Sequence, residues 1–415
     1  MSLTPRAALI FLALVSTVLT LPIGIVSLLL LAFLAIVGGD ARAAHSDVRL
    51  RRAMPRLVAR GIAAPVSIEI EWPAASTVRL RQATNADVEL NPSEDGSSLT
   101  AELIARRRGR HVVPPVAARG EGPLGLASWQ RDLGEAAEIL VYPDLPAARR
   151  LALAVRQGRF RDAGRHGRGP LGLGTDFESI RDYVPDDDIR QVNWLATSRM
   201  GKPMSNQFRI DQDQDVMCLV DTGRLMGAPL GDRTRLDSAI DAAAAVALVA
   251  DELGDRCGTI AFDETVRRAI RPRRSGGHGV VQVLFDLEST AKDSDYELAF
   301  RTVGGAKRSF ILVLTDLIEE AAARPLIAAM PHLTRRHVVV VATAEDLDLS
   351  DSLGLDPIGP VDVYRKVIAL DMMNARDRVV RSLRGAGADV VVAPPNSLSA
   401  ACVRLYLRSK ARVRL

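Results

Sequence analysis

The first 40 residues restrict the fold more than any other segment. No charged side chain occurs in Ala7–Gly39, and nearly all of that stretch is apolar. A helix rises about 1.5 Å per residue and the hydrocarbon core of a bilayer is about 30 Å thick, so the stretch is long for one upright span and short for two. Pro22 and Gly24 lie at its midpoint. Two alternatives follow: one long tilted or kinked helix, or a hairpin with the halves Ala7–Leu21 and Ile23–Val37.

The charges that flank this stretch predict its orientation. Arg6 precedes it, and the residues after it are rich in arginine, with Asp47 as the one acid among residues 41–60. These arginines are Arg42, Arg49, Arg51, Arg52, Arg56 and Arg60. The positive-inside rule therefore places everything after residue 40 in the cytoplasm, with membrane lipid as a partner of the N-terminus. Ala41-Arg42-Ala43 also resembles a signal-peptide cleavage site, but the apolar run is too long for a signal and the arginines oppose translocation.

Composition excludes several classes of protein. At 415 residues the chain has room for two or three domains, and its 47% hydrophobic and 25% charged residues are typical of a globular protein. Aromatic residues make up only 4%, which disfavours stacking on single-stranded nucleic acid. Residues 1–210 carry 27 basic and 21 acidic groups, whereas 211–415 carry 27 and 29. We therefore expect no nucleic-acid partner.

The three cysteines form no recognisable framework. Cys218, Cys257 and Cys402 are far apart, odd in number and without CxxC or Cys/His ligand spacing. Neither disulfides nor a zinc site is expected, and a reducing compartment fits best.

The chain after the apolar stretch changes its pattern several times. We expect a transmembrane segment at 1–40 and a basic juxtamembrane segment at 41–62. Short alternating strands, such as Val66–Trp72, then predict a small β-sandwich over 63–144. Residues 145–209 are interpreted as a connector. Residues 210–415 are interpreted as an α/β domain.

The C-terminal segment alternates apolar strands with helices. The expected strands are Val216–Val220, Cys257–Phe262, Phe310–Leu314, His337–Ala342 and Ala388–Ala393. The expected helices are Arg235–Leu253, Val280–Leu287, Ala321–His332, Val361–Arg384 and Ser397–Ser409. Solidly apolar strands joined by helices predict a doubly wound parallel sheet that is covered on both faces.

Two carboxylates follow strands of that sheet. Ligands bind at the carboxyl ends of such strands, where Asp221 and Asp316 lie. The position resembles the metal-ion-dependent adhesion site of a von Willebrand factor A domain, which uses Asp-x-Ser-x-Ser after its first strand. Here Gly223 and Leu225 stand where that motif has serines, and Arg224 adds a cation. The sequence therefore predicts a degenerate site, with Mg²⁺ binding by Asp221 and Asp316 as one alternative and helix capping as the other.

A dense polar constellation occupies residues 172–209. It contains the triplet Asp186, Asp187 and Asp188 behind Pro185, ahead of an expected helix at Ile189–Ala196. Adjacent carboxylates are potential cation ligands, but no metal-loop spacing is present. We favour an Asp-capped helix start whose acids are neutralised by Arg181, Arg190 and Arg199. Gly167–Gly172 fits a GxGxxG pattern, but it lacks the preceding strand and is interrupted by Pro170, so it is assigned to a loop.

Together these features resemble the bacterial domain-of-unknown-function 58 family. The segment TDFESIRDYVPDDDIRQVNWLATSR is similar to the signature of that family and departs from it at Asp186, Thr197 and Ser198. The matching residues are Asp176, Phe177, Ser179, Arg181, Tyr183, Pro185, Asp187, Asp188, Arg190, Trp194 and Arg199. The resemblance implies a membrane hairpin, a β-rich segment and a von Willebrand factor A-like fold in the bacterial inner membrane, with the soluble domains in the cytoplasm.

The resemblance also implies a role. Family members look like partners of MoxR-type AAA+ ATPases, so the expected function is a membrane-anchored, non-enzymatic adaptor or scaffold without a cofactor. The alternative is a hydrolase that uses the Asp176–Asp188 carboxylates and a divalent cation. A base and a nucleophile at recognisable spacing are missing, which favours the adaptor.

Overall fold

The computed structural model describes residues 2–19, 21–45, 48–73, 75, 77–157, 176–184, 192–209, 214–304, 308–354, 356 and 358–412. The chain divides into two compact units, Met1–Tyr142 and Pro143–Leu415. The mixed α/β architecture with an N-terminal apolar helix and several sheets agrees with the sequence prediction.

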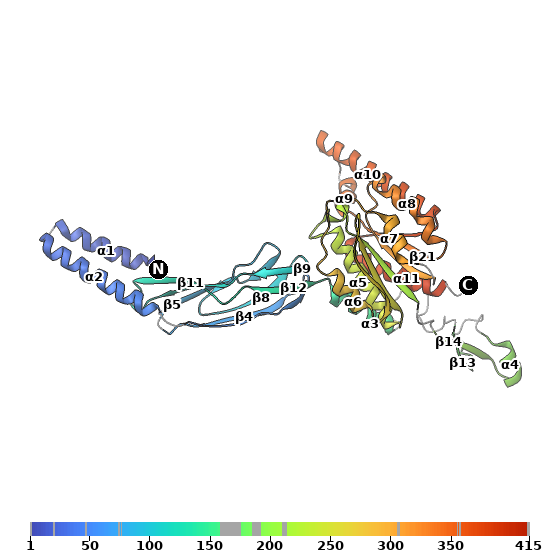
Figure 1. The fold of residues 1–415 in the computed structure, drawn as a ribbon, viewed down its shortest axis with the longest axis horizontal. Coiled ribbons are helices and arrows are strands. Elements are labelled where there is room, and N and C mark those ends of the chain that lie inside the picture. Colours follow the sequence, from blue (N-terminus) through green and yellow to red (C-terminus); the bar gives the residue numbers. More distant parts are fainter. Residues whose placement is uncertain are drawn as a thin grey trace. The chain divides into compact units, whose positions relative to one another are not determined.

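Two apolar helices open the first unit and run side by side (Figure 1). They are α1 (Pro5–Ser16), continued by a 3-10 turn at Thr17–Leu19, and α2 (Ile23–Ala44). Their contact includes the rings of Phe11 and Phe33, whose centroids are 6.4 Å apart. By length and composition α2 meets the requirement for crossing a membrane, a property it shares with signal sequences. Most of its large apolar side chains are exposed.

The base of this hairpin is built into the β-rich part of the same unit. The buried carboxylate of Asp40 accepts hydrogen bonds from the backbone N–H groups of Leu124 (2.7 Å), Leu126 (2.9 Å) and Ala127 (2.9 Å). Gly122 lies against that carboxylate, and a Cβ there would overlap it. A polar residue near the end of an apolar helix is thus explained by the turn that it binds.

Tryptophan and threonine side chains make further links at the same base. The indole N–H groups of Trp72 and Trp129 donate to the carbonyls of Ala44 (2.9 Å) and Ala41 (2.7 Å). Thr4 caps α1 and donates its hydroxyl to the Gly125 carbonyl at 2.7 Å. Both ends of the hairpin are therefore tied to the β-rich part.

The β-rich part consists of sheets that share one apolar core. The strands are β1 (Ser2–Leu3), β2 (Arg49–Ala53), β3 (Leu57–Ala59), β4 (Ala64–Glu71), β5 (Thr77–Arg81), β6 (Val88–Asn91), β7 (Glu94–Asp95), β8 (Ser98–Ala105), β9 (Gly109–Val113), β10 (Val116–Glu121), β11 (Ala127–Leu133) and β12 (Ala137–Tyr142). The sheet orders are β1-β11-β10-β5-β7, β2-β4-β8-β6 and β3-β12-β9. Alternating side chains such as Val66, Ile68 and Ile70 point into this core, as the period-two pattern predicts.

The second unit is organised around a six-stranded sheet. Its order is β19-β18-β15-β20-β21-β22, and every neighbouring pair is parallel except β18 and β19. The strands are β15 (Asp215–Asp221), β18 (Arg256–Phe262), β19 (Val266–Arg274), β20 (Ser309–Leu314), β21 (Val338–Ala344) and β22 (Asp389–Ala393). The edge strand β19 was not expected from the sequence. Its arginines and Pro272 are typical of an edge that resists further pairing.

Helices cover both faces of this sheet. They are α3 (Leu145–Arg156), α5 (Arg235–Glu252), α6 (Gly277–Leu284), α7 (Tyr296–Val303), α8 (Glu320–Thr334), α9 (Leu347–Gly354), α10 (Pro360–Gly385) and α11 (Pro395–Arg412). Val216 and Cys218 of β15 pack with α3, α5 and α11, whereas Met217 and Leu219 pack with α7, α8 and α10. Residues 145–209 were expected to form a connector, but α3 at the start of that range packs into the core of the second unit. A 3-10 turn at Arg224–Gly227 and the short strands β16 (Pro229–Leu230) and β17 (Arg233–Thr234) precede α5.

Residues around the family signature form a separate antiparallel pair. Strand β13 (Asp176–Asp182) pairs with β14 (Met204–Arg209), and α4 (Trp194–Met200) lies between them in sequence. The expected helix at Ile189–Ala196 differs from α4, which begins after the N-cap Asn193. The aspartate triplet lies outside the described residues. Strand β13 has four charged residues in seven, so its pairing with β14 was not evident from local pattern.

Candidate functional site

Three buried aspartates gather at the carboxyl ends of neighbouring strands. Asp221 ends β15, Asp263 directly follows β18, and Asp316 lies two residues after β20. Each is less than 10% exposed. The predicted pair Asp221 and Asp316 is therefore brought to one edge of the sheet, and Asp263 is an additional member that sequence reasoning missed.

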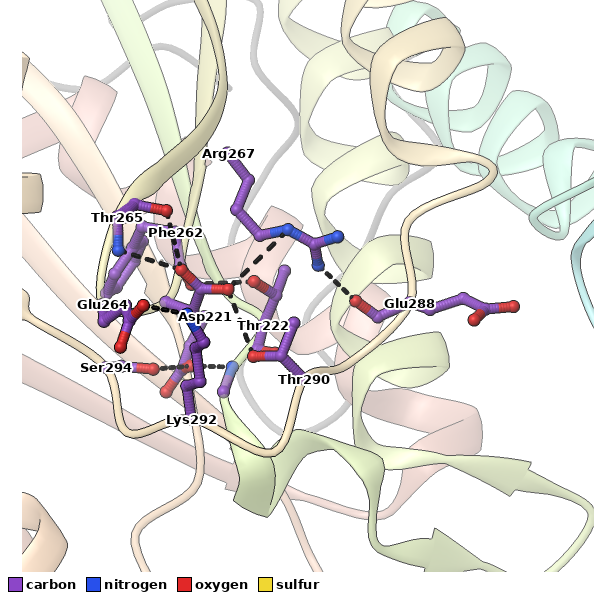
Figure 2. Close-up of polar contacts among 12 residues, drawn as sticks. Asp221, Thr222, Phe262, Glu264, Thr265, Arg267, Glu288, Thr290, Lys292 and Ser294 are labelled. Carbon is purple, nitrogen blue, oxygen red and sulfur yellow. Dashed lines mark hydrogen bonds and ion pairs between the residues drawn. The ribbon is translucent and has the colours of Figure 1, made fainter.

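Four hydrogen-bond donors of the protein contact the Asp221 carboxylate, and Figure 2 shows Ser294 among them. Its Oδ1 accepts the Gly223 N–H at 2.8 Å and the Ser294 hydroxyl at 2.5 Å. Its Oδ2 accepts the hydroxyls of Tyr296 at 2.9 Å and Thr315 at 2.6 Å. The hydroxyl oxygens of Tyr296 and Thr315 lie 2.9 Å from each other, but each has one hydrogen, which it donates to the carboxylate. Four donors thus satisfy a buried charge that would otherwise be costly.

Burial keeps the tyrosine of this network in its donor form. Burial, reinforced by the charge of Asp221, raises the pKa of Tyr296 well above its usual range. The phenol is therefore protonated at any physiological pH and donates to the carboxylate.

A serine at position 223 would be incompatible with this arrangement. A Cβ on Gly223 would overlap the Ser294 hydroxyl and approach the Lys292 carbonyl oxygen to 2.9 Å. That carbonyl also accepts the Arg224 N–H at 2.8 Å, which holds the two loops together. The motif Asp-x-Ser-x-Ser has a serine where this chain has Gly223. Only a residue without a side chain leaves room for Ser294 beside Asp221.

Asp316 is occupied by a buried arginine. Arg235, at the start of α5, donates to Asp316 at 2.8 Å and to Asp346 at 2.9 Å. Burial raises the pKa of Asp316, and the Arg235 charge opposes that rise without cancelling it. The second predicted metal ligand is therefore part of an internal ion-pair network.

Asp263 forms a third closed group at this edge. Its carboxylate accepts the Thr265 N–H at 2.9 Å and the Thr290 hydroxyl at 3.1 Å, with Arg267 at 3.7 Å (Figure 2). Burial alone would raise its pKa, but the bonds from Thr265 and Thr290 and the Arg267 charge hold the pKa below the usual range. The Asp-x-Thr spacing after an apolar strand is the signal that would have identified it.

No cluster of three or more His, Cys, Asp or Glu side chains suited to a metal ion occurs in the described part of the chain. Protein donors contact both carboxylate oxygens of Asp221, and Arg235 contacts Oδ1 of Asp316. The donor set favours a hydrogen-bonded edge over a cation site.

A cavity of about 510 Å³ lies beside Asp316. Its lining is Leu225, Ala228, Arg235, Asp316, Ile318, Glu319, Glu320, Asp371, Met372 and Ala375. Apolar side chains and carboxylates therefore share the cavity. It lies between the starts of α5 and α8 and the middle of α10, at the edge where α/β sheets bind ligands.

The signature residues are placed in part. Asp176, Phe177, Ser179 and Arg181 belong to β13, Tyr183 follows it, and Trp194 and Arg199 are on α4. Pro185, Asp187, Asp188 and Arg190 lie outside the described residues. An ion pair joins Lys202 and Asp182 at 2.7 Å, whereas Arg181 donates to the Asp182 carbonyl. The helix α4 exposes Trp194 (70%), Leu195 and Met200.

Comparisons with known proteins agree with part of the sequence resemblance. The family model described as "Protein of unknown function DUF58" matches residues 179–363. Uncharacterized proteins Rv1480 of Mycobacterium tuberculosis and Mb1516 of Mycobacterium bovis are each 25% identical over 277 residues, which covers 60% of this chain and 84% of theirs.

Among solved structures, a match is the crystal structure of trypsin-activated alpha-2-macroglobulin from Escherichia coli. It has 11% identity and a TM-score of 0.18, and it covers 89% of this chain but 27% of that chain. A likeness at this score carries no argument about fold. Over residues 179–363 the chain is therefore similar to the DUF58 proteins. The three aspartates at the edge of the sheet, Asp221, Asp263 and Asp316, lie within that range.

Proposed function

We propose that the protein is a membrane-anchored, non-enzymatic adaptor that works with a MoxR-type AAA+ ATPase in protein assembly or remodelling. The observation that carries the proposal is the saturated Asp221 carboxylate, whose four acceptor positions are filled by donors of the protein itself. A sheet edge closed in this way offers a shaped surface to another protein rather than an open coordination position for chemistry.

The proposal includes a von Willebrand factor A type for the C-terminal unit. It is supported by a mainly parallel sheet with helices on both faces and by an aspartate at the end of the central strand β15. In this proposal the adhesion site is degenerate, and hydroxyl groups occupy the carboxylate in place of Mg²⁺.

The anchor part of the proposal rests on the base of the helical hairpin. Ala41 begins the sequence that resembles a cleavage site, and Ala44 directly follows it. Both are buried, and their carbonyls accept hydrogen bonds from Trp129 and Trp72. Removal of the hairpin would also remove the Asp40 carboxylate, so three backbone N–H groups in and after the β10–β11 turn would lose their acceptor. These contacts favour a retained anchor over a cleaved signal, in a bacterial inner membrane with the soluble units in the cytoplasm.

The hydrolase alternative depends on Asp187 and Asp188, which lie outside the described residues. No contact of the described residues favours it, so the adaptor is the function we propose. Replacement of both by Asn with unchanged folding and partner binding but lost function would revive the hydrolase.

The test is purification of the tagged full chain from detergent-solubilised native membranes, with ATP or ADP, followed by mass spectrometry. We expect the intact N-terminal hairpin and a co-purifying AAA+ ATPase whose amount depends on the nucleotide. Untagged membranes processed in parallel provide the background. A mature N-terminus near Ala44 would contradict the anchor, and absence of any AAA+ ATPase across mild detergents and both nucleotides would contradict the adaptor.

A further inference from the structure

The first half of α10 exposes a broad apolar surface. We call it the α10 face, and its members are Val361, Val363, Tyr364, Val367, Ile368 and Leu370. Tyr364 is 71% exposed, Val361 61% and Ile368 58%. The second half of the same helix behaves differently, because Val379, Val380 and Leu383 are buried in the core.

These six residues lie on one side of the helix. At about 100° per residue their positions fall within one half of the circumference. The buried Ala369 and the polar Asp362, Arg365 and Lys366 occupy the other half. A helix normally turns its apolar side to the core, but here the apolar side faces solvent (Figure 1 shows the start of α10 standing clear of the sheet). An exposed apolar surface of this extent is typical of an interaction site.

The surroundings of the α10 face are acidic. Eight acidic and three basic residues occur between Glu345 and Asp377, in a chain whose formal net charge is +4. Asp371, one turn beyond Val367 on the same half of the helix, has no hydrogen-bond or ion-pair partner among the described residues. A partner must therefore supply both apolar contacts and positive charge.

The cavity beside Asp316 continues this surface along the helix. Asp371, Met372 and Ala375 of α10 line it together with Glu319 and Glu320 at the start of α8. Arginines of the same unit already pair with Asp316, Glu319 and Glu320, which leaves Asp371 as the lining carboxylate without a partner among the described residues. Apolar lining beside this carboxylate fits a long side chain that ends in a cation, such as arginine or lysine.

Two other occupants fit the same observations less well. An anionic lipid surface would be repelled by the acidic surroundings. A second copy of this chain would bring two acidic surfaces together, which opposes a symmetric dimer through α10.

We propose that the α10 face and the adjoining cavity bind a basic amphipathic helix of the ATPase partner, with a cationic side chain of that helix at Asp371. The identity of the partner rests on the proposed function; the position and chemistry of the site do not. The apolar side of the partner helix covers the six residues, in the helix-in-groove mode.

The test uses the full chain in native membranes with a photo-reactive benzoylphenylalanine in place of Tyr364. A matched control carries the same residue at the exposed Arg381, in the second half of α10. We expect a cross-link to an AAA+ ATPase from position 364 and none from 381. We expect Ile368→Glu and Asp371→Lys each to reduce the 364 product about tenfold, as truncation of interface anchors does. Because both side chains are exposed, the thermal unfolding of these variants should match that of the parent.

The other outcomes separate the two proposals. If the parent still co-purifies with the ATPase but position 364 yields no cross-link to it, the docking site is wrong and the adaptor function stands. If position 364 cross-links only a second copy, lipid or another protein, the proposed occupant is wrong. If no ATPase co-purifies with the parent, the adaptor function fails, and the identity of the proposed partner fails with it.

Discussion

The network at Asp221 makes the sharpest prediction. Asp221→Asn keeps the shape of the side chain and one acceptor oxygen, but its amide group faces two donors in place of the second oxygen. A hydrogen bond to a charged group contributes about 1.5–3 kcal/mol. In the variant one of the two hydroxyls can donate to the other instead, because Tyr296 and Thr315 lie 2.9 Å apart, and this offsets part of the loss. We therefore expect the free energy of unfolding of the C-terminal unit to fall by about 3–5 kcal/mol.

Calorimetry of the full chain in detergent measures this loss. The three tryptophans are Trp72, Trp129 and Trp194, all outside residues 214–415, so intrinsic fluorescence would not report on the sheet. At roughly 2–4 °C per kcal/mol for a unit of this size, the transition should move down by about 10 °C. Asp293→Asn is the matched control at the same edge, because its exposed ion pair with Arg224 contributes only about 0–1 kcal/mol.

The same experiment with Mg²⁺ tests the reasoning itself. A site occupied at about 100 times its Kd would add about 2.7 kcal/mol of stability. Because protein donors already fill the carboxylate, we expect millimolar Mg²⁺ to shift the wild-type transition little or not at all. A clear rise with Mg²⁺ that disappears in Asp221→Asn would refute the closed network and restore a metal site.

Three further predictions concern other buried contacts. Lys410→Met leaves the buried Asp255 carboxylate without its cation and should cost about 3–5 kcal/mol in chemical denaturation; a loss below about 1 kcal/mol would contradict this. Gly122→Ala should displace the Asp40 carboxylate and speed amide hydrogen exchange in the β10–β11 turn; unchanged exchange there would show that the turn does not depend on it. The pKa of Asp263 lies below its usual range, so its stabilisation is complete above the ordinary pKa of about 3.9 and is lost as the pH falls through the lower folded value. In Asp263→Asn the free energy of unfolding should therefore decrease less steeply as the pH is lowered. The same pH dependence as in the wild type would contradict the hydrogen bonds assigned to Asp263.

Local pattern was sufficient for much of the fold. Solidly apolar runs such as Phe310–Leu314 became buried parallel strands, because strands covered on both faces have no solvent side to alternate toward. The alternation in Val66–Trp72 led to β4, where every second side chain is buried. Both patterns depend only on the period of the backbone, which is the same wherever the element lies.

Elements without a strong period were missed for a physical reason. Strand β13 is mostly charged and owes its form to pairing with β14, whereas β19 owes its form to pairing with β18. Pairing energy comes from residues distant in the chain, so no short window of sequence contains it.

The candidate site divides along the same line. Asp221 and Asp316 were predicted because each directly follows, or nearly follows, an apolar strand. Their partners were not, since Ser294, Tyr296 and Thr315 reach Asp221 across 73, 75 and 94 positions of sequence. Whether the edge holds a cation or hydrogen bonds depends on those partners.

The sequence by itself determined the order of the segments: an uncharged N-terminal stretch, an alternating β-rich part and an α/β unit with aspartates after its strands. These features follow from composition and period, which act within a few residues. Only the tertiary structure decided that Asp40 locks the hairpin to a β-turn, that hydroxyl groups close Asp221, and that the start of α10 leaves its apolar side uncovered. Each of these depends on which distant groups meet after folding, because the cost of a buried charge or an exposed apolar face is set by its neighbours in space.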